Sequence, residues 1–344
     1  MGVSERSTPL SEAPSQPLTT APERAPIGKP KVIYVMGAGH SGSTILGVAL
    51  GNCSDSFYAG EVDEWLINGG MPGVGGTERG EFWAQVRERM RDSEAEQLFG
   101  GVVNRAIERS SSLLRPDAWL RRRALRRRYR EVADALLRAI AGTAGVTHVV
   151  DTSHFPLRAR ELQRSREVEL YLVLLVRDPQ DVVASNVREL RRHELAERRV
   201  RIFATNLDLW LTHLLSTVVF LRHPRARRVF VTHEAFLADP EGTMEQIVRA
   251  LGTGTALPDM GALRAGVALE GNAMISRETV AVRRSVRKVE RWSGLTSLMQ
   301  ACWGPVFARL RPVAVGGAQA AGAQAGSPGT EAPAPGTESA ERRG

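Results

Sequence analysis

The chain has 344 residues, of which 42% are hydrophobic, and it carries a formal net charge of +8. This apolar content is sufficient for a folded core and excludes a wholly disordered protein. The two cysteines, Cys53 and Cys302, exclude a disulfide framework and favour reducing, cytoplasmic surroundings. The basic balance suits an anionic ligand, but equally a nucleic acid or an acidic carrier protein, so charge alone selects no partner.

The ends of the chain differ in composition from its middle. Residues 1–29 are rich in Ser, Pro and Thr, and residues 313–344 in Gly, Ala and Pro, so both are predicted to be disordered tails. The sequence therefore predicts one folded domain over residues 30–312. Its most apolar run, residues 209–221, is short and interrupted by polar side chains, so we expect no transmembrane segment and a cytoplasmic protein.

The first predicted strand, Val32–Met36, leads into a glycine-rich turn and then an apolar helical segment. Backbone N–H groups of such a turn converge on one point, and the helix dipole adds positive potential there, which is typical of a phosphate-binding loop. The residues expected to contact the anion are Gly39, His40, Ser41, Gly42, Ser43 and Thr44. A nucleoside triphosphatase loop has a lysine after its last glycine. This chain has Ser43 there, which favours a phosphate-bearing donor other than ATP.

Three further strands are predicted along the chain, at His148–Val150, Leu170–Val176 and Arg228–Thr232. Each is followed by a polar turn and a helix-like pattern. This alternation predicts an α/β fold with three layers, in which helices flank a central parallel sheet. Ligands of such sheets bind at the carboxyl ends of the strands, so the residues that follow each strand are the candidates for the site.

A second anion-binding element is predicted after the strand Leu170–Val176. Arg177 stands at the end of this strand, and Ser185 lies eight residues further on, about two turns into the helix that Asp178 and Pro179 begin. An arginine at a strand end and a hydroxyl on the adjoining helix can hold a second phosphate. The alternative is a surface arginine and an ordinary helix serine.

Together, these two segments resemble the bipartite signature of cytosolic and Golgi-type sulfotransferases, which use 3′-phosphoadenosine 5′-phosphosulfate (PAPS). In that family a [KR]-S-G-[ST]-[ST] loop holds the 5′-phosphosulfate, and an R-D-P…S segment holds the 3′-phosphate. Residues 42–44 match the first element, with His40 in the position usually held by Lys or Arg. Arg177 and Ser185 match the second element.

The resemblance extends over about residues 30–300, through Gly60–Glu61 (a G-E element), residues 149–154 (a D-S-S-K segment with His for Lys), residues 232–240 (a Y-E-D-L…D-P stretch) and residues 271–277. The last segment resembles the region that closes over the nucleotide, which implies that Arg277 contributes to the 3′-phosphate site. The resemblance as a whole implies a P-loop NTPase-like sulfotransferase fold. It also implies transfer of a sulfuryl group from PAPS to a hydroxyl or amine, without a metal.

This chemistry requires stabilisation of the leaving phosphate and a general base for the acceptor. Loop N–H groups, hydroxyls and His40 would stabilise the charge that develops on the leaving group. For the base, the G-E position makes Glu61 the first candidate. The rival is His154, which follows a strand and should face the same crevice. A glutamate after a glycine is also common as a plain first-turn helix residue.

Two arginine-rich runs, residues 119–130 and 191–201, are interpreted first as solvated helix faces. The alternative is that they bind an acidic acceptor, either a small molecule, a glycan or a carrier-linked intermediate, or an anionic membrane surface. The acceptor pocket is expected within residues 62–145 and 188–225. Two other functions stay open at this point: a kinase with a degenerate loop, and a basic nucleic-acid-binding protein. Aromatic residues make up only 6% of the chain, which disfavours nucleic acid as a partner.

Overall fold

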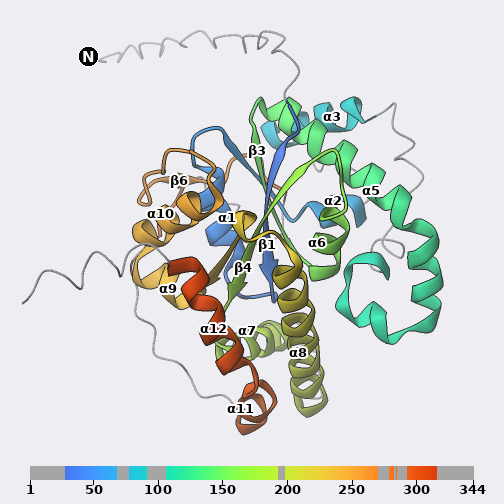
Figure 1. Ribbon diagram of the computed structural model, residues 1–344, viewed down its shortest axis with the longest axis vertical. Helices are drawn as coiled ribbons and strands as arrows, with labels where there is room; N and C mark the ends of the chain where they lie inside the picture. Colours follow the sequence, from blue (N-terminus) through green and yellow to red (C-terminus); the bar gives the residue numbers. More distant parts are fainter. Residues whose placement is uncertain are drawn as a thin grey trace, which may run out of the picture.

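The computed structural model describes residues 28–67, 77–90, 106–192, 198–269, 279–282, 284 and 293–315. Its centre is a parallel sheet of five strands in the order β2-β3-β1-β4-β5 (Figure 1). The strands are β1 (Lys31–Gly37), β2 (Ser56–Gly60), β3 (His148–His154), β4 (Glu169–Val176) and β5 (Arg228–Thr232). A short antiparallel pair, β6 (Leu263–Arg264) and β7 (Thr279–Val280), lies outside this sheet.

Helices connect the strands and cover both faces of the sheet (Figure 1). Those that follow the first three strands are α1 (Ser43–Gly51), α2 (Val62–Ile67), α3 (Glu78–Arg89), the 3-10 turn η2 (Ser110–Leu114), α5 (Pro116–Ala144) and α6 (Pro156–Leu162). Those that follow the last two strands are α7 (Pro179–Arg192), α8 (Arg198–Arg222), the 3-10 turn η3 (Arg225–Arg227), α9 (His233–Ala238), α10 (Pro240–Leu251), α11 (Gly294–Gln300) and α12 (Trp303–Val315).

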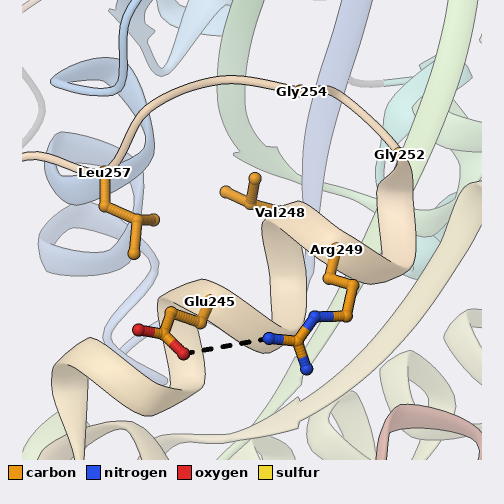
Figure 2. A pocket seen from close by; sticks show the side chains of 6 residues that line it. All are labelled: Glu245, Val248, Arg249, Gly252, Gly254 and Leu257. Atoms are coloured by element: carbon orange, nitrogen blue, oxygen red, sulfur yellow. Dashed lines mark ion pairs between the residues drawn. The ribbon is translucent and has the colours of Figure 1, made fainter. Parts of the chain in front are cut away.

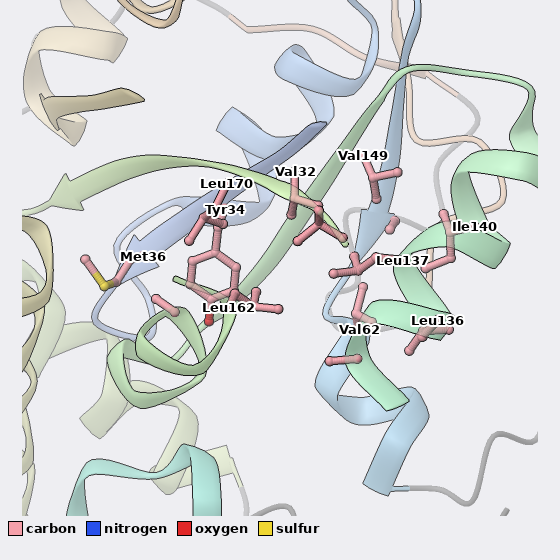
Figure 3. Packing of buried hydrophobic residues seen from close by; sticks show 14 of the residues in the cluster. Val32, Tyr34, Met36, Val62, Leu136, Leu137, Ile140, Val149, Leu162 and Leu170 are labelled. Carbon is pink, nitrogen blue, oxygen red and sulfur yellow. The ribbon is translucent and has the colours of Figure 1, made fainter. Parts of the chain in front are cut away.

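The alternation of side chains along β1 divides the core into two layers. Val32, Tyr34 and Met36 point to one face, where they pack with residues of α5 and α6 (Figure 3). Ile33 and Val35 point to the other face and pack with residues of α1, α9 and α10. Because both faces are covered, the central strands β1 and β4 are apolar over almost their whole length, as expected of a parallel sheet. The predicted three-layer α/β class is confirmed.

Helix α1 lies close to the sheet because two of its residues have no side chain. A Cβ atom on Gly47 would lie 2.5 Å from Thr152 Cγ2, and one on Gly51 would lie 2.3 Å from the Cβ of Tyr58. Both distances are shorter than real Cβ contacts. The helix that follows the glycine-rich loop is therefore held against β2 and β3, which fixes the direction in which its amino end points.

The structure contains one strand that the sequence did not predict and one helix that runs past a predicted boundary. Strand β2 was not among the predicted strands, because its five residues, Ser-Phe-Tyr-Ala-Gly, include a single fully apolar aromatic side chain and no β-branched residue. Helix α12 continues to Val315, so the predicted domain end at residue 312 falls inside a helix. Residues 1–27 and 316–344, which make up nearly all of the two predicted tails, lie outside the described part of the chain.

Helix α8 contains one segment, Val200–Arg222, that has the length and composition to cross a membrane, and it is the single such helix within the described ranges. Only 39% of its most apolar window is buried. The core helix of a globular protein passes the same test, and α8 packs against α6, α7, α11 and the sheet. We therefore treat α8 as part of the domain.

The arginine-rich run of α5 has two different faces. Arg122, Arg126 and Arg130 recur every fourth residue and point to Glu161 of α6, with N–O distances of 3.8, 2.7 and 3.2 Å. Glu161 is fully buried, and Arg164 approaches it to 3.8 Å from the next turn. The remaining arginines of the run include exposed residues such as Arg127, whose side chain is 87% accessible. The interpretation as a solvated face is therefore correct for only part of the run. Side chains 190–199, most of the second run, lie outside the described part of the structure.

Candidate active site

The carboxyl ends of the five strands bring the residues that follow them to one edge of the sheet. In the order of the strands these are Glu61 after β2, His154 at the end of β3, the loop of residues 38–42 after β1, Arg177 after β4 and His233 after β5. The chain leaves β1 toward β2 but leaves β3 toward β4, in the opposite direction. A crevice for a ligand forms where adjacent strands diverge in this way.

The loop after β1 has the backbone shape of an anion cradle. His40 and Gly42 both adopt left-handed conformations, with φ of 62° and 91°, and such reversals turn successive N–H groups toward one point. The Ser41 hydroxyl donates to the Ala38 carbonyl over 2.6 Å and closes the turn. A Cβ on Gly42 would lie 2.3 Å from His233 Nδ1, so only glycine fits there.

The amino end of α1 has no side-chain cap, as is also the case for α5 and α6, which begin with a proline instead. The side chains of Thr77, Thr232, Asp239 and Ser293 accept a hydrogen bond from the first turn of α3, α9, α10 and α11, respectively. Gly42, which precedes α1, has no side chain to do so. The first-turn N–H groups of α1 thus stay available for an external acceptor, and an anion is the acceptor that the helix dipole favours.

The buried side chain of Arg177 holds this loop in position. Its side chain is 8% exposed, its Nη1 donates to the His40 carbonyl over 2.9 Å, and its Nη2 lies 3.6 Å from Asp181 Oδ2. Asp178 caps α7 by accepting from the Gln180 N–H, and its own N–H donates to Glu234 of α9. The predicted phosphate ligand Arg177 therefore also holds the conformation of the loop. Ser185, one of the predicted ligands of the 3′-phosphate, is partly exposed on α7.

His40 projects toward α7. Its Nε2 lies 3.1 Å from Glu189 Oε2, an ion pair when the ring is protonated, and about a third of its side chain is exposed. A carboxylate in this position orients the imidazole ring. The histidine that takes the place of a lysine or arginine in the loop thus has a partner that the sequence did not reveal.

Glu61 lies in an environment that disfavours its charge. Burial, together with the negative charges of Glu64 and Asp151, raises the pKa of Glu61 to about 7. Its backbone is positioned by Gly60, which has a φ of 84° and packs against Leu269. A carboxyl group with a pKa near neutrality is well suited to accept a proton from a substrate.

His154 has the opposite shift. The pKa of His154 is lowered to about 4, mainly by burial and also by the charges of Arg109 and His40, and a hydrogen bond with the Thr152 backbone and the charge of Asp151 oppose this only in part. The ring is therefore neutral at physiological pH and weakly basic. His154 also has a left-handed φ of 54°, which is uncommon for a residue other than glycine at a strand end.

A fully buried ion pair lies under the β3 side of the site. Arg158 of α6 donates to Asp151 Oδ2 through Nε at 3.1 Å and Nη2 at 2.9 Å, and both residues are inaccessible to solvent. Its Nη1 donates to the Tyr129 hydroxyl at 2.7 Å and to Glu108 Oε1 at 3.2 Å, and Tyr129 donates to the same Glu108 oxygen. Burial lowers the pKa of Arg158, but Asp151, Tyr129 and Glu108 together hold it well above its usual value.

This network also links the two candidate bases. Asp151 Oδ1 accepts hydrogen bonds from the N–H and the hydroxyl of Ser153, next to His154. The Ser153 hydroxyl oxygen in turn accepts from the N–H of Asp63, in the helix that Glu61 precedes. The end of β3, which carries His154, and the start of α2, which follows Glu61, are therefore joined through one serine.

The structure thus brings together most of the predicted site residues: the loop residues 39–44, Arg177, Glu61 and His154 all lie at one end of the sheet. Arg277 falls outside the described residues, and its predicted role stays a prediction. The sequence reasoning did not single out His233, although its position after a strand is the signal used for the others. It also missed Glu189 and Arg158, because nothing in a single sequence marks a helix residue as the partner of a distant one.

A cavity of about 430 Å³ lies far from this edge, at the carboxyl end of α10 (Figure 2). It is lined by the ion pair Glu245–Arg249 and by Val248, Gly252, Gly254 and Leu257. Ala256, next to Leu257, bonds with Ser54 just before β2 begins. The cavity is therefore at the amino ends of the strands, opposite the loop, and does not belong to the site.

Comparison with known proteins assigns a family. A sulfotransferase family model matches residues 30–256, more than half of the chain. Among solved structures, the chain is similar to the sulfotransferase domain of the curacin biosynthetic pathway, with 14% identity, a TM-score of 0.46, and coverage of 80% of this chain and 98% of that domain.

A sulfotransferase from Mycobacterium avium is also similar, with 16% identity, a TM-score of 0.43, and coverage of 66% of this chain and 64% of that one. One from Alicyclobacillus acidocaldarius has 14% identity, a TM-score of 0.37, and coverage of 72% and 89%. No significant match was found among curated proteins. On the family match over residues 30–256, this chain belongs to the sulfotransferase family.

Proposed function

We propose that the protein transfers a sulfuryl group from PAPS to a hydroxyl or amine of an acceptor in the cytoplasm. The observation that carries the proposal is the loop of residues 38–42, whose two left-handed residues and uncapped helix form a cradle for the 5′-phosphosulfate. Ser43 and Thr44 add hydroxyls there, and Ser185 and Arg277 are proposed for the 3′-phosphate. Ser43 in place of the triphosphatase lysine, together with the family match, weighs against the kinase and nucleic-acid alternatives.

In this proposal Glu61 is the general base and His40 stabilises the leaving group. Glu61 has a pKa of about 7 and His154 a pKa of about 4, so at neutral pH Glu61 is the stronger base of the two. Glu61 accepts the proton of the acceptor as its oxygen or nitrogen attacks sulfur in line with the departing phosphate oxygen. His40, oriented by Glu189, donates to that oxygen as it gains charge. His154, neutral beside Glu61, serves to position the acceptor.

Binding of the product nucleotide tests the donor. We expect 3′-phosphoadenosine 5′-phosphate to raise the melting temperature, because a ligand that binds only the folded state stabilises it, and AMP to raise it less for want of the 3′-phosphate. Ser185→Ala should reduce the shift with the bisphosphate toward that with AMP. Ser185 is the better probe than Arg177, since loss of Arg177 would also release the His40 carbonyl.

The same titration with ATP and magnesium is the control for the donor. A larger shift with ATP than with the bisphosphate would contradict the sulfotransferase proposal and favour a kinase. Equal shifts with AMP and the bisphosphate in the unmodified protein would place the 3′-phosphate outside any binding site and contradict the assignment of Ser185.

The role of His40 is tested by two substitutions that differ in charge. His40→Ala should lower kcat roughly 10²–10³-fold, the cost of losing one donor to a developing oxyanion. His40→Lys restores a cation that resembles that of the family loop, so it should keep kcat within about tenfold of the original. Both should leave the melting temperature nearly unchanged, because about a third of the His40 side chain is exposed. Equal activity of all three proteins would exclude His40 from the reaction.

A further inference from the structure

A second cavity, of about 310 Å³, lies between η2 and the first turns of α5. Its polar lining consists of Arg109, Ser111, Ser112, Arg115, Asp117 and Arg121. Three arginines face a single aspartate, so the cavity carries excess positive charge. It falls within residues 62–145, one of the two segments in which the acceptor pocket is expected.

The positive charge of this cavity is only partly neutralised. Arg115 forms a two-point contact with Asp117, with Nε–Oδ1 at 3.2 Å and Nη2–Oδ2 at 2.8 Å. No acidic side chain of the described residues lies within ion-pair distance of Arg109 or Arg121. The Ser111 hydroxyl is exposed and donates to no group in the described part of the chain. The charges of Asp208 and Asp117 act on Arg109 and Arg121, respectively, but neither carboxylate pairs with them within ion-pair distance, so both guanidinium groups and the Ser111 hydroxyl keep donors for an anion.

Arg109 connects this cavity to the candidate active site. Its guanidinium carbon lies 5.7 Å from the centre of the Phe155 ring, and that ring lies 4.3 Å from the ring of His154. The backbone of Arg109 is fixed by Ser112, whose hydroxyl donates to the Arg109 carbonyl over 2.7 Å. A ligand that contacts Arg109 is thus separated from His154 by one aromatic side chain.

The cavity lies toward the same end of the molecule as the candidate active site. The arrowheads of β1 and β4 point toward the end of the molecule where α7 and α8 lie, and α5 extends its amino end in the same direction (Figure 1). The turn η2 packs against α8. The cavity therefore flanks the crevice on the side of β3, where Glu61 and His154 lie, and is separate from the loop of residues 38–42, which would hold the donor.

We infer that this cavity binds an anionic group of the acceptor, such as a phosphate, sulfate or carboxylate, and that the substrate is therefore an anion with its hydroxyl or amine directed to Glu61. The inference rests on the proposed function for the identity of the site. The volume is at the lower limit of ligand cavities, which suits one small charged group rather than a whole nucleotide. Charge-assisted hydrogen bonds from Arg109, Arg121 and Ser111 would hold it.

Pyrophosphate is a suitable probe, used by calorimetry on the full chain with the donor site saturated by 3′-phosphoadenosine 5′-phosphate, in 0.15 M salt. We expect one further binding site. Arg109→Gln and Arg121→Gln should each weaken it roughly 10- to 100-fold, the effect of one hydrogen bond to a charged group. Arg123→Gln is the matched control: it removes the same charge from the exposed surface of the same helix, outside the cavity, and should keep the affinity.

The outcomes separate this inference from the proposed function. No second site, or equal weakening by all three substitutions, would overturn the inference and show at most a diffuse attraction to positive charge. The rise in melting temperature with 3′-phosphoadenosine 5′-phosphate would still test the donor independently.

The position of the anion is read from the ring signals of His154 by NMR. These signals are identified by their loss in His154→Gln. An anion at Arg109 should raise the pKa of His154. If pyrophosphate binding left that pKa unchanged, the anion would be bound away from the site.

Discussion

Glu61→Gln is expected to abolish most of the activity and at the same time to stabilise the protein. Loss of a general base lowers kcat/KM by about 10²–10⁴-fold. Glutamine keeps the shape of the side chain but carries no charge, so it removes the cost of holding a carboxylate in a partly buried position beside Asp151. Activity and melting temperature measured on the same preparation check both effects.

The stabilisation should depend on pH in a defined direction. Because the pKa of Glu61 is raised in the folded state, from 4.5 to about 7, the unmodified protein loses stability as pH rises through this interval. At pH 8 the substitution should therefore stabilise, on the order of 1–3 kcal/mol. At pH 4 the carboxyl group is largely protonated in both states, and most of the gain should disappear. A loss of activity without this pH-dependent gain would mean that Glu61 acts through structure.

The activity of the unmodified enzyme should follow the same ionisation. Below pH 7, kcat/KM should fall about tenfold per pH unit, because a base acts only when deprotonated. Glu64→Gln is the matched control, with the same chemical change three residues away. This variant should retain activity, and its kcat/KM should begin to fall at a lower pH, because the charge of Glu64 helps to raise the pKa of Glu61. If kcat/KM of the unmodified enzyme fell only near pH 4, the base would be His154 instead.

Arg158→Met is expected to cause the largest loss of stability. It leaves Asp151 and Glu108 without their cation in a region that solvent does not reach, and breaking one side of a buried ion pair costs about 3–5 kcal/mol. Arg138→Met makes the same change in an exposed pair with Glu167 and should cost about 0–1 kcal/mol. Denaturant unfolding of both variants checks the contrast.

A second substitution keeps this test informative if Arg158→Met does not fold. Asp151→Asn combined with Arg158→Met removes one of the two stranded carboxylates, so the double variant should regain part of the loss. Ser153 would keep a neutral partner, and the link between β3 and α2 would persist. Similar costs for Arg158→Met and Arg138→Met would show that the buried network contributes no more than a surface pair.

The fold and the loop were accessible from the sequence because both depend on local patterns. Apolar strands that alternate with helices specify a covered parallel sheet, and Val32–Met36 with the turn after it specify a strand, a reversal and a helix start. Gly42 illustrates the limit of this reasoning. Its left-handed φ is expected of glycine in a tight turn, but the sequence does not show that the ring of His233 occupies the space where a side chain would be.

The chemistry of the site, by contrast, was decided by tertiary structure. The sequence placed Glu61 ahead of His154 on position alone and gave no pKa for either, because pKa depends on burial and on charges that other segments supply, such as Asp151 and Arg109. Arg177 was expected to hold a phosphate, and the fold shows that it also holds the loop, through a carbonyl 137 residues away.

The arginine-rich run of α5 shows the same division most clearly. The sequence by itself determined that the run is helical and basic. Only the packing of α6 decided that one face surrounds the buried Glu161, while the amino end of the helix adds Arg121 to a cavity beside the site. The period of a helix is written in its own residues, but the partner of each face is set by which other segment the fold places against it.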